Sequence, residues 1–162
     1  MANTQAMCTS FLGEVLTATH NFTTGTGNTF KAALYTATAN TSSSTTLCAS
    51  VTAYAATVNT VPEVSGTNYS AGGVAITNGT SPLSTNSSTT AGVGYWTPTA
   101  SITYTNVTLS TAFDTVLIYN YSASNKAVSV HTFGSQTVTA GTFTLTMPSN
   151  TTTTALLRLA TT

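Results

Sequence analysis

VLIYNY, residues Val116–Tyr121, is the most hydrophobic segment of this 162-residue sequence, and it decides the fold. Its apolar run, Val116–Tyr119, is far shorter than the stretch of about 20 apolar residues that a membrane-spanning helix needs. Valine, isoleucine and tyrosine are also residue types that favour strands. We therefore predict that Val116–Tyr121 is a strand that runs through the centre of the core.

The segments around this one share its preference for strands. Thr-rich runs alternate apolar and polar residues, and clusters of Gly, Pro, Asn or Ser separate them. The predicted strands are Phe30–Ala37, Tyr69–Thr77, Tyr95–Tyr104, Ala127–Phe133 and Ala155–Ala160. The pair Gly72-Gly73 predicts a bulge or a tight bend. Gln136–Thr139 and Thr142–Met147 are predicted to form a hairpin around the turn Ala140-Gly141.

One helix is predicted, at Thr9–Thr19, where apolar residues form a stripe and Ser10 is placed to cap the first turn. The rest of the pattern is about seven to nine short strands with turn signals between them. It predicts an all-β fold: a single-domain antiparallel β-sandwich, jelly-roll-like, with a short N-terminal helix. We divide the chain into an N-terminal helix and arm, residues 1–28, and the sandwich, residues 29–162.

The composition is almost without charge. Charged residues are 4% of the chain, against about 25% in a typical soluble domain, and the net charge is zero. Thr, Ser and Asn supply the polarity, and these side chains are cheaper to desolvate against a partner than ions are. Because copies of such a chain hardly repel one another, we expect a symmetric homo-oligomer, with a trimer as first choice and a dimer as second.

The same composition argues against several partners. Lys31, Lys126 and Arg158 are the only basic residues, too few for the cluster that phosphate binding requires, so no nucleic-acid partner is expected. No apolar run is long enough for a membrane span. The N-terminal sequence MANTQAMCTSFLGEVL lacks the basic region and long apolar core of a signal peptide, which predicts synthesis in a cytoplasm without export by the usual route.

The search for chemistry predicts no catalytic residue, no cofactor-binding residue and no metal ligand. The three carboxylates, Glu14, Glu63 and Asp114, lie in different predicted elements. A triad of serine with His131 and Asp114 can be drawn, but no G-x-S-x-G turn supports it. His20 and His131 are therefore interpreted as surface or hydrogen-bonded histidines. Asp114 is predicted to accept backbone N–H bonds in a turn before the central strand.

Three further features have structural interpretations. Of Tyr95 and Trp96, we expect one ring to enter the core and the other to cover a rim, with a binding platform as the alternative. Arg158, inside the apolar run ALLRLA, is expected to extend from an edge strand or to face a neighbouring subunit. Cys8 and Cys48 are interpreted as two small buried thiols, because a cytoplasm is too reducing to favour a disulfide.

Several motifs occur in an order that resembles a family of small virion structural proteins of tailed phages. They are FKAALYTATAN, EVSGTNYSAGGVAIT, FDTVLIYN and ALLRLA, beginning at Phe30, Glu63, Phe113 and Ala155. The resemblance covers nearly the whole chain, from Phe11 to Ala160. It implies a particle component without catalysis or cofactor. Both a head decoration protein and a tail-associated protein are compatible with it.

These observations lead to one expected function and two alternatives. We expect a non-enzymatic capsid decoration (cement) protein of the virion, which contacts copies of itself and other virion proteins such as the major capsid protein. Such a protein stabilises a shell because it binds the assembled form. The alternatives are a tail or fibre-base structural component and a glycan- or surface-binding module.

Overall fold

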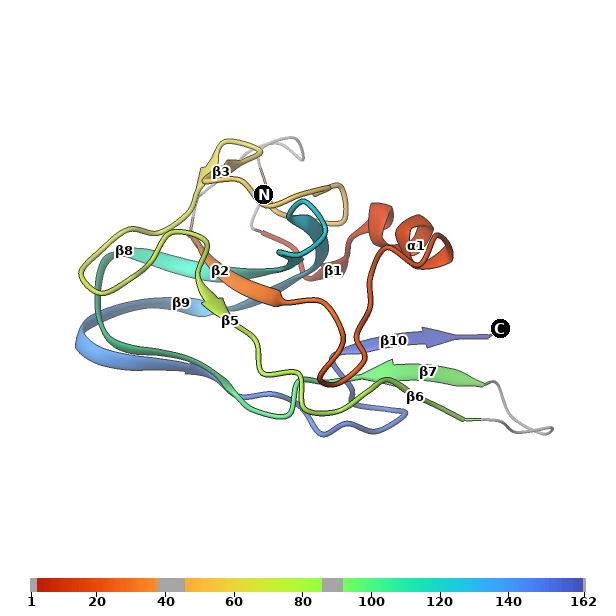
Figure 1. The fold of residues 1–162 in the computed structure, drawn as a ribbon. Helices are drawn as coiled ribbons and strands as arrows, with labels where there is room; N and C mark the ends of the chain where they lie inside the picture. Colours follow the sequence, from red (N-terminus) through yellow and green to blue (C-terminus); the bar gives the residue numbers. More distant parts are fainter. Residues whose placement is uncertain (1–2, 38–45, 86–91, 162) are drawn as a thin grey trace.

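The computed structural model describes residues 3–37, 46–85 and 92–161. The described part of the chain is all-β with one short helix, and its strands form antiparallel sheets (Figure 1). In chain order its elements are β1 (Ala6–Met7), α1 (Thr9–Leu16), β2 (Phe30–Thr36), β3 (Thr57–Val58), β4 (Val61–Pro62), β5 (Val74–Ala75), β6 (Leu83–Ser84), β7 (Val93–Trp96), β8 (Ile102–Asn120), β9 (Lys126–Leu145) and β10 (Leu157–Ala160). No helix in the described ranges has the length and apolar character needed to cross a membrane.

The largest sheet has the strand order β1-β9-β8-β2-β5 and is built around the hairpin of β8 and β9. Residues Val116–Asn120 of the VLIYNY segment form the end of β8, in the middle of this sheet, and Tyr121 lies in the turn that follows. Leu117 pairs with Ala33 of β2 on one side and with Val130 of β9 on the other. Val116–Tyr119 are at most 2% exposed, which confirms the prediction that this segment lies at the centre of the core.

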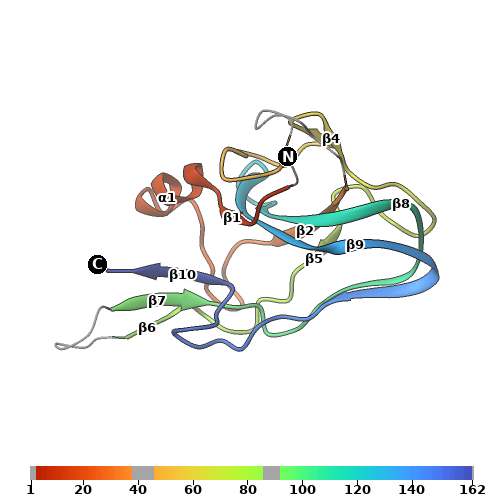
Figure 2. The ribbon, with the colours of Figure 1, turned by 180° about the vertical axis from the view of Figure 1, so that it is seen from behind.

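The β8–β9 hairpin bends back on itself. Its pairing register shifts four times between Tyr104 and Thr115, and bulges of this kind bend a strand. Figures 1 and 2 show both strands curving round at one end of the molecule. The bend brings the first half of β8 against β2, where the Tyr104 hydroxyl donates to the Ala32 carbonyl oxygen at 2.8 Å. Tyr104, from the first half of β8, is in this way part of the core that also contains β2 and the end of β8.

The predicted hairpin at Ala140-Gly141 is wrong. β9 continues through both residues, and the chain reverses instead between the end of β8 at Asn120 and the start of β9 at Lys126. Ala140 has a φ of 45°, and Gly141 pairs with Val107, so the two residues belong to a bulge. A small residue followed by glycine is compatible with a hairpin turn and with a bulge. The two structures differ in whether the chain reverses there or continues along a partner strand.

The predicted helix at Thr9–Thr19 is confirmed as α1, which ends three residues earlier than expected. Cys8 occupies the N-cap position, so the prediction that Ser10 caps the helix is wrong. The helix ends because Ala18 takes a positive φ of 56° and donates its N–H to the Val15 carbonyl oxygen. Before α1, the short strand β1 pairs with β9 and holds the N-terminal segment to the sheet.

The segment between β4 and β5 crosses the large sheet as an irregular strap. Gly72 and Gly73 have φ values of 87° and 67°, which confirms the predicted tight bend. A Cβ atom at Gly73 would lie 1.7 Å from the Ala32 carbonyl oxygen of β2. Glycine is required here because the strap passes directly over the backbone of β2 before β5 pairs with it.

A smaller sheet, with the order β10-β7-β6, lies at the end of the molecule that also carries α1 and the C-terminus (Figures 1 and 2). The predicted strand Tyr95–Tyr104 is wrong as one unit, because β7 ends at Trp96 and β8 begins at Ile102. Pro98 lies between them and cannot donate a ladder hydrogen bond. The predicted strand Ala155–Ala160 is confirmed in its second part as β10.

Candidate docking groove

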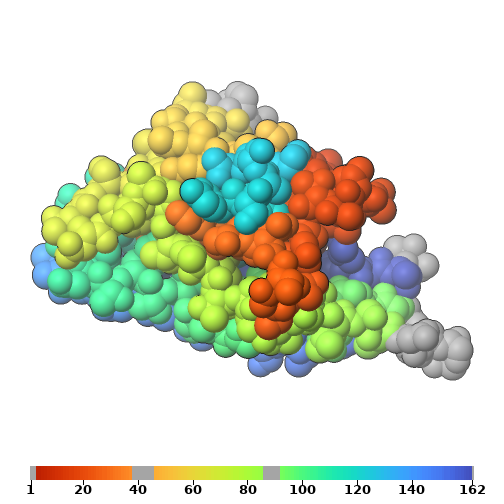
Figure 3. Space-filling view, in the orientation of Figure 1, coloured from red at the N-terminus to blue at the C-terminus, as the bar shows by residue number. Residues whose placement is uncertain are grey.

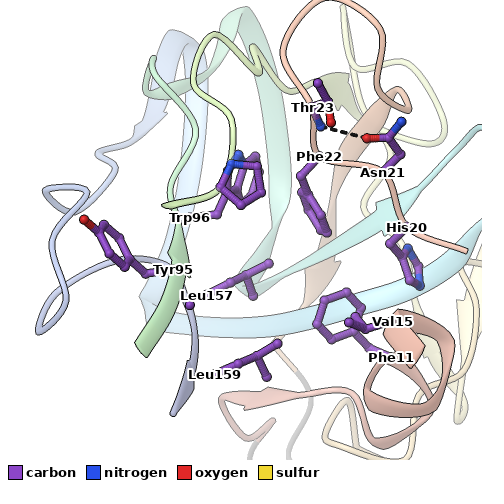
Figure 4. Close-up of a pocket in the computed structure, with 12 residues that line it drawn as sticks. Phe11, Val15, His20, Asn21, Phe22, Thr23, Tyr95, Trp96, Leu157 and Leu159 are labelled. Atoms are coloured by element: carbon purple, nitrogen blue, oxygen red, sulfur yellow. Dashed lines mark hydrogen bonds between the residues drawn. The ribbon is translucent and has the colours of Figure 1, made fainter. Parts of the chain in front are cut away.

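An apolar groove with a volume of about 340 Å³ lies between α1 and the smaller sheet (Figure 4). We call it the α1–β10 groove. Its apolar lining comes from α1, the segment after α1, β7 and β10, namely Phe11, Val15, Phe22, Trp96, Leu157 and Leu159. None of the residues that line it is Asp, Glu, Lys or Arg.

Strand alternation gives the smaller sheet an apolar inner face. Leu157 pairs with Trp96 and Leu159 pairs with Gly94, so these four residues lie on the same face. Because Gly94 has no side chain, the sheet leaves space beside Leu159. Figure 4 shows both leucines pointing toward Phe11 on α1.

The two aromatic residues of β7 point in opposite directions. Trp96 is buried against the ring of Phe22, with the ring centroids 4.7 Å apart, and its indole N–H donates to Asn78 at 3.0 Å and to Thr80 at 3.1 Å. Tyr95 is half-buried and points away from the groove (Figure 4). The prediction that one ring of the pair enters the core is confirmed for Trp96, and the ring of Tyr95 stays outside the core.

A charge network joins α1 to the end of β8 and the start of β9, and its member His20 also lines the groove. His20 lies 2.7 Å from Glu14 and 3.1 Å from Asn120, and its side chain is fully buried. Lys126, at the start of β9, donates to Glu14 at 2.6 Å. Partial burial works against the ionised carboxylate, but the hydrogen bonds from Lys126 and His20 hold the pKa of Glu14 below its ordinary value. The network fastens α1 to the β8–β9 turn.

The outer edge of β10 is free within the described part of the chain. The Thr161 N–H donates to the Gly92 carbonyl oxygen, so alternate residues of β10 face β7. The backbone groups of Arg158 and Ala160 therefore point away from the sheet, and no described residue bonds to them. Arg158 is exposed on this edge strand, as predicted.

Exposed leucines occur on the elements that surround the groove, and one of them, Leu159, lines it. Leu16, at the end of α1, is 88% exposed, and the other exposed leucines are Leu12 on α1, Leu83 on β6 and Leu159 on β10. Figure 3 shows α1 and the C-terminal strand at the same end of the molecule. Gathered apolar exposure of this kind marks interaction surfaces in soluble proteins.

The residues of the imagined triad have separate partners. His131 lies 2.9 Å from the Ser129 hydroxyl. Asp114 accepts hydrogen bonds from the Asn3 amide at 2.9 Å and from the Thr115 hydroxyl at 2.6 Å. The prediction that Asp114 lies in a turn and accepts backbone N–H bonds is wrong, because β8 extends through it and its partners are side chains.

Glu63 organises a cluster that sequence reasoning missed. Its carboxylate accepts hydrogen bonds from the hydroxyls of Tyr54 and Tyr69, each at 2.7 Å, and from the Gly72 N–H at 2.8 Å. Burial and the adjacent Glu63 raise the pKa of both tyrosines above their usual range. The sequence did contain a signal for this cluster: Glu63, one of only three carboxylates in the chain, is followed closely by Tyr69 and the pair Gly72-Gly73. This cluster anchors the strap to the sheet.

The partly buried imidazole of His131 should make the stability depend on pH. Burial lowers its pKa from 6.5 to about 4, so the folded protein keeps it neutral while the unfolded chain takes up a proton below pH 6.5. The neutral His131 therefore contributes its full share to the free energy of unfolding above pH 6.5. As the pH falls toward 4, the free energy of unfolding decreases by about 2–3 kcal/mol through this residue.

Urea unfolding of wild type and of His131→Gln at pH 7 and pH 4.5 measures this loss. The carboxylates titrate in both proteins, so the difference between them isolates His131. We expect the variant to lose less stability than wild type between these pH values. An equal loss in the two proteins would contradict the assignment.

Within the described residues, no group of three His, Cys, Asp or Glu side chains is placed to hold a metal ion. The strongest candidate for function is therefore the α1–β10 groove. Comparisons with models of protein families, with curated proteins and with solved structures found no match to this chain.

Proposed function

We propose that this protein is a non-enzymatic structural component of a tailed-phage particle, and specifically a capsid decoration protein that associates with copies of itself and with the shell. The observation that carries the proposal is the α1–β10 groove, an apolar hollow beside a free strand edge, with the exposed Leu159 in its lining and exposed leucines on the helix α1 that forms one of its sides. The assignment to a phage particle rests on the order of the sequence motifs, which resembles that of small virion structural proteins. Location in the virion follows from the same proposal.

A second copy of the chain is the occupant that best fits the groove. The net charge is zero, so two copies do not repel each other at long range. Each copy presents exposed leucines and an apolar hollow on one surface, and closed symmetric association lets each satisfy the other. An interface of ordinary size covers about 800 Å² of each partner, roughly a tenth of the 7889 Å² accessible surface of this chain.

The placement of the carboxylates supports a structural role. Glu14 is bound by Lys126 and His20, and Asp114 by Asn3. Glu63 is bound by tyrosine hydroxyls. We also propose that the fold is a jelly-roll-like β-sandwich, in which the two halves of the bent β8–β9 hairpin supply the facing layers. The bulges in the hairpin support this arrangement.

The two alternative functions, a tail or fibre-base component and a glycan-binding module, would use different parts of the surface. A tail or fibre-base component would use the same groove in a ring or spike. A glycan-binding module based on Tyr95 and Trp96 is less well supported, because Trp96 is buried. Quantitative mass spectrometry of purified particles separates the first two: a copy number close to that of the shell protein indicates decoration, and a few copies indicate the tail. Absence from particles would contradict the virion role.

Self-association should be visible in the isolated protein. We expect sedimentation at micromolar concentration to show a closed oligomer, a trimer or else a dimer, at both low and high salt because ions contribute little. Leu16→Glu places a charge at the exposed end of α1, the helix that forms one side of the groove, without disturbing the core. It should weaken association at least tenfold, which corresponds to about 1.4 kcal/mol.

The matched control is Thr139→Glu, which introduces the same charge at an exposed position on β9. This variant should associate like wild type. A monomeric wild type at every salt concentration would contradict self-association, and equal weakening by both variants would show that the groove is not the interface.

A further inference from the structure

The two cysteines lie on neighbouring segments although they are about 40 positions apart in the chain. Residues 47–49 run beside residues 3–9. The Thr4 N–H donates to the Leu47 carbonyl oxygen at 2.9 Å, and the Thr9 N–H donates to the Ala49 carbonyl oxygen at 2.8 Å. These two hydrogen bonds flank Cys8 on one segment and Cys48 on the other.

This arrangement places the two cysteines close together. The Thr9–Ala49 hydrogen bond joins the residues that directly follow the two cysteines, and Cys48 is near enough to contribute to the raised pKa of Cys8. A disulfide spans Cα separations of roughly 4.4–6.8 Å. Both thiols are free in the structure.

The two thiols have different environments. Cys8 is fully buried at the start of α1, and burial, together with the neighbouring Cys48, raises its pKa to about 12. Cys48 is partly exposed, and its sulfur lies 3.2 Å from the Ser50 hydroxyl. Partial burial works against its thiolate, but the hydrogen bonds from Ser50 lower the pKa of Cys48 below the ordinary value. Cys48 is thus the thiol that an oxidant in solution reaches first.

We propose that Cys8 and Cys48 form an oxidation site that closes an intramolecular disulfide in an oxidising medium. The oxidant is a small disulfide such as glutathione disulfide. The Cys48 thiolate attacks one of its sulfurs, which forms a mixed disulfide and releases one glutathione thiolate. The Cys8 sulfur then attacks the sulfur of Cys48, releases the second glutathione and passes its proton to that leaving thiolate. Two cysteine thiols are oxidised, and one glutathione disulfide is reduced to two glutathiones.

The bond would tie residues 47–49 to the first turn of α1, which forms one side of the α1–β10 groove. A crosslink that closes a loop of about 40 residues restricts the unfolded chain, and it should raise Tm by roughly 10 °C in a protein of this size. Oxidation would in this way lock the N-terminal segment onto the body of the protein.

The experiment compares reduced protein with protein equilibrated against glutathione disulfide under native conditions. Intact mass and alkylation with iodoacetamide after unfolding report the thiols, and calorimetry reports Tm. We expect oxidised wild type to lose the mass of two hydrogens, to resist alkylation and to melt at the higher temperature. A reducing agent should reverse all three changes.

Two variants identify the order of attack. Cys8→Ala keeps a small apolar side chain in the core and should stop at a single glutathione adduct on Cys48. Cys48→Ser keeps a hydroxyl beside Ser50 and should show neither an adduct nor a Tm shift. Two thiols still open to alkylation in oxidised wild type would overturn the proposal, and so would a crosslink between two chains or an adduct that forms first on Cys8.

Discussion

Replacing Gly73 by alanine should prevent folding or lower the free energy of unfolding by about 4 kcal/mol or more. The new Cβ would lie 1.7 Å from the Ala32 carbonyl oxygen and 2.5 Å from its carbon. Ala32 lies in β2 and pairs with Ile118 of the central strand, so β2 cannot withdraw without breaking that ladder. The positive φ of 67° at Gly73 adds backbone strain to the collision.

Gly25→Ala is the matched control for this prediction. Gly25 also has a positive φ, 77°, but no atom lies within 4 Å of the position that its Cβ would take. Gly25→Ala should therefore lower the free energy of unfolding only through backbone strain, by about 1–2 kcal/mol. Urea unfolding followed by the fluorescence of Trp96 measures both variants. Equal costs would show that the close approach to β2 is not what requires glycine at position 73.

Truncation of Leu117 to alanine should lower the free energy of unfolding by about 4 kcal/mol. The side chain is completely buried, and the backbone of Leu117 is held on both sides by pairing with β2 and β9, so the strand cannot move to fill the cavity. Leu16→Ala removes the same atoms from a side chain that is 88% exposed, and in dilute monomer it should change stability by less than about 0.5 kcal/mol. Similar losses in the two variants would mean that β8 is not the centre of the core.

The motifs that carry the family resemblance serve mainly to build the fold. Glu63 and Gly73 anchor the strap to the sheet, and a Cβ at Gly66 would lie 2.0 Å from the Thr108 carbonyl oxygen of β8. FDTVLIYN supplies the buried half of β8. Of these motifs, ALLRLA also reaches the α1–β10 groove, through Leu157 and Leu159. These motifs therefore shape the fold through packing, and one of them also lines the groove.

The sequence by itself determined the elements that depend on local pattern. The all-β class, the central strand at Val116–Tyr121 and the helix that begins at Thr9 follow from apolar runs and residue preferences within a few positions. The glycine pair predicted a tight bend for the same reason, because a positive φ is a property of the residue itself. The edge position of Arg158 followed from a single charge in an apolar run.

Only the tertiary structure decided which segments meet. Ala140-Gly141 is a bulge rather than a turn because β8 pairs with β9 along its full length. Asp114 binds Asn3, 111 positions away, and the groove combines α1 with strands from the other end of the chain. The physical reason is that local pattern encodes whether a residue is buried and which backbone shape it prefers. The identity of its partner depends on long-range pairing, and many Thr-rich strands of similar pattern could compete for that pairing.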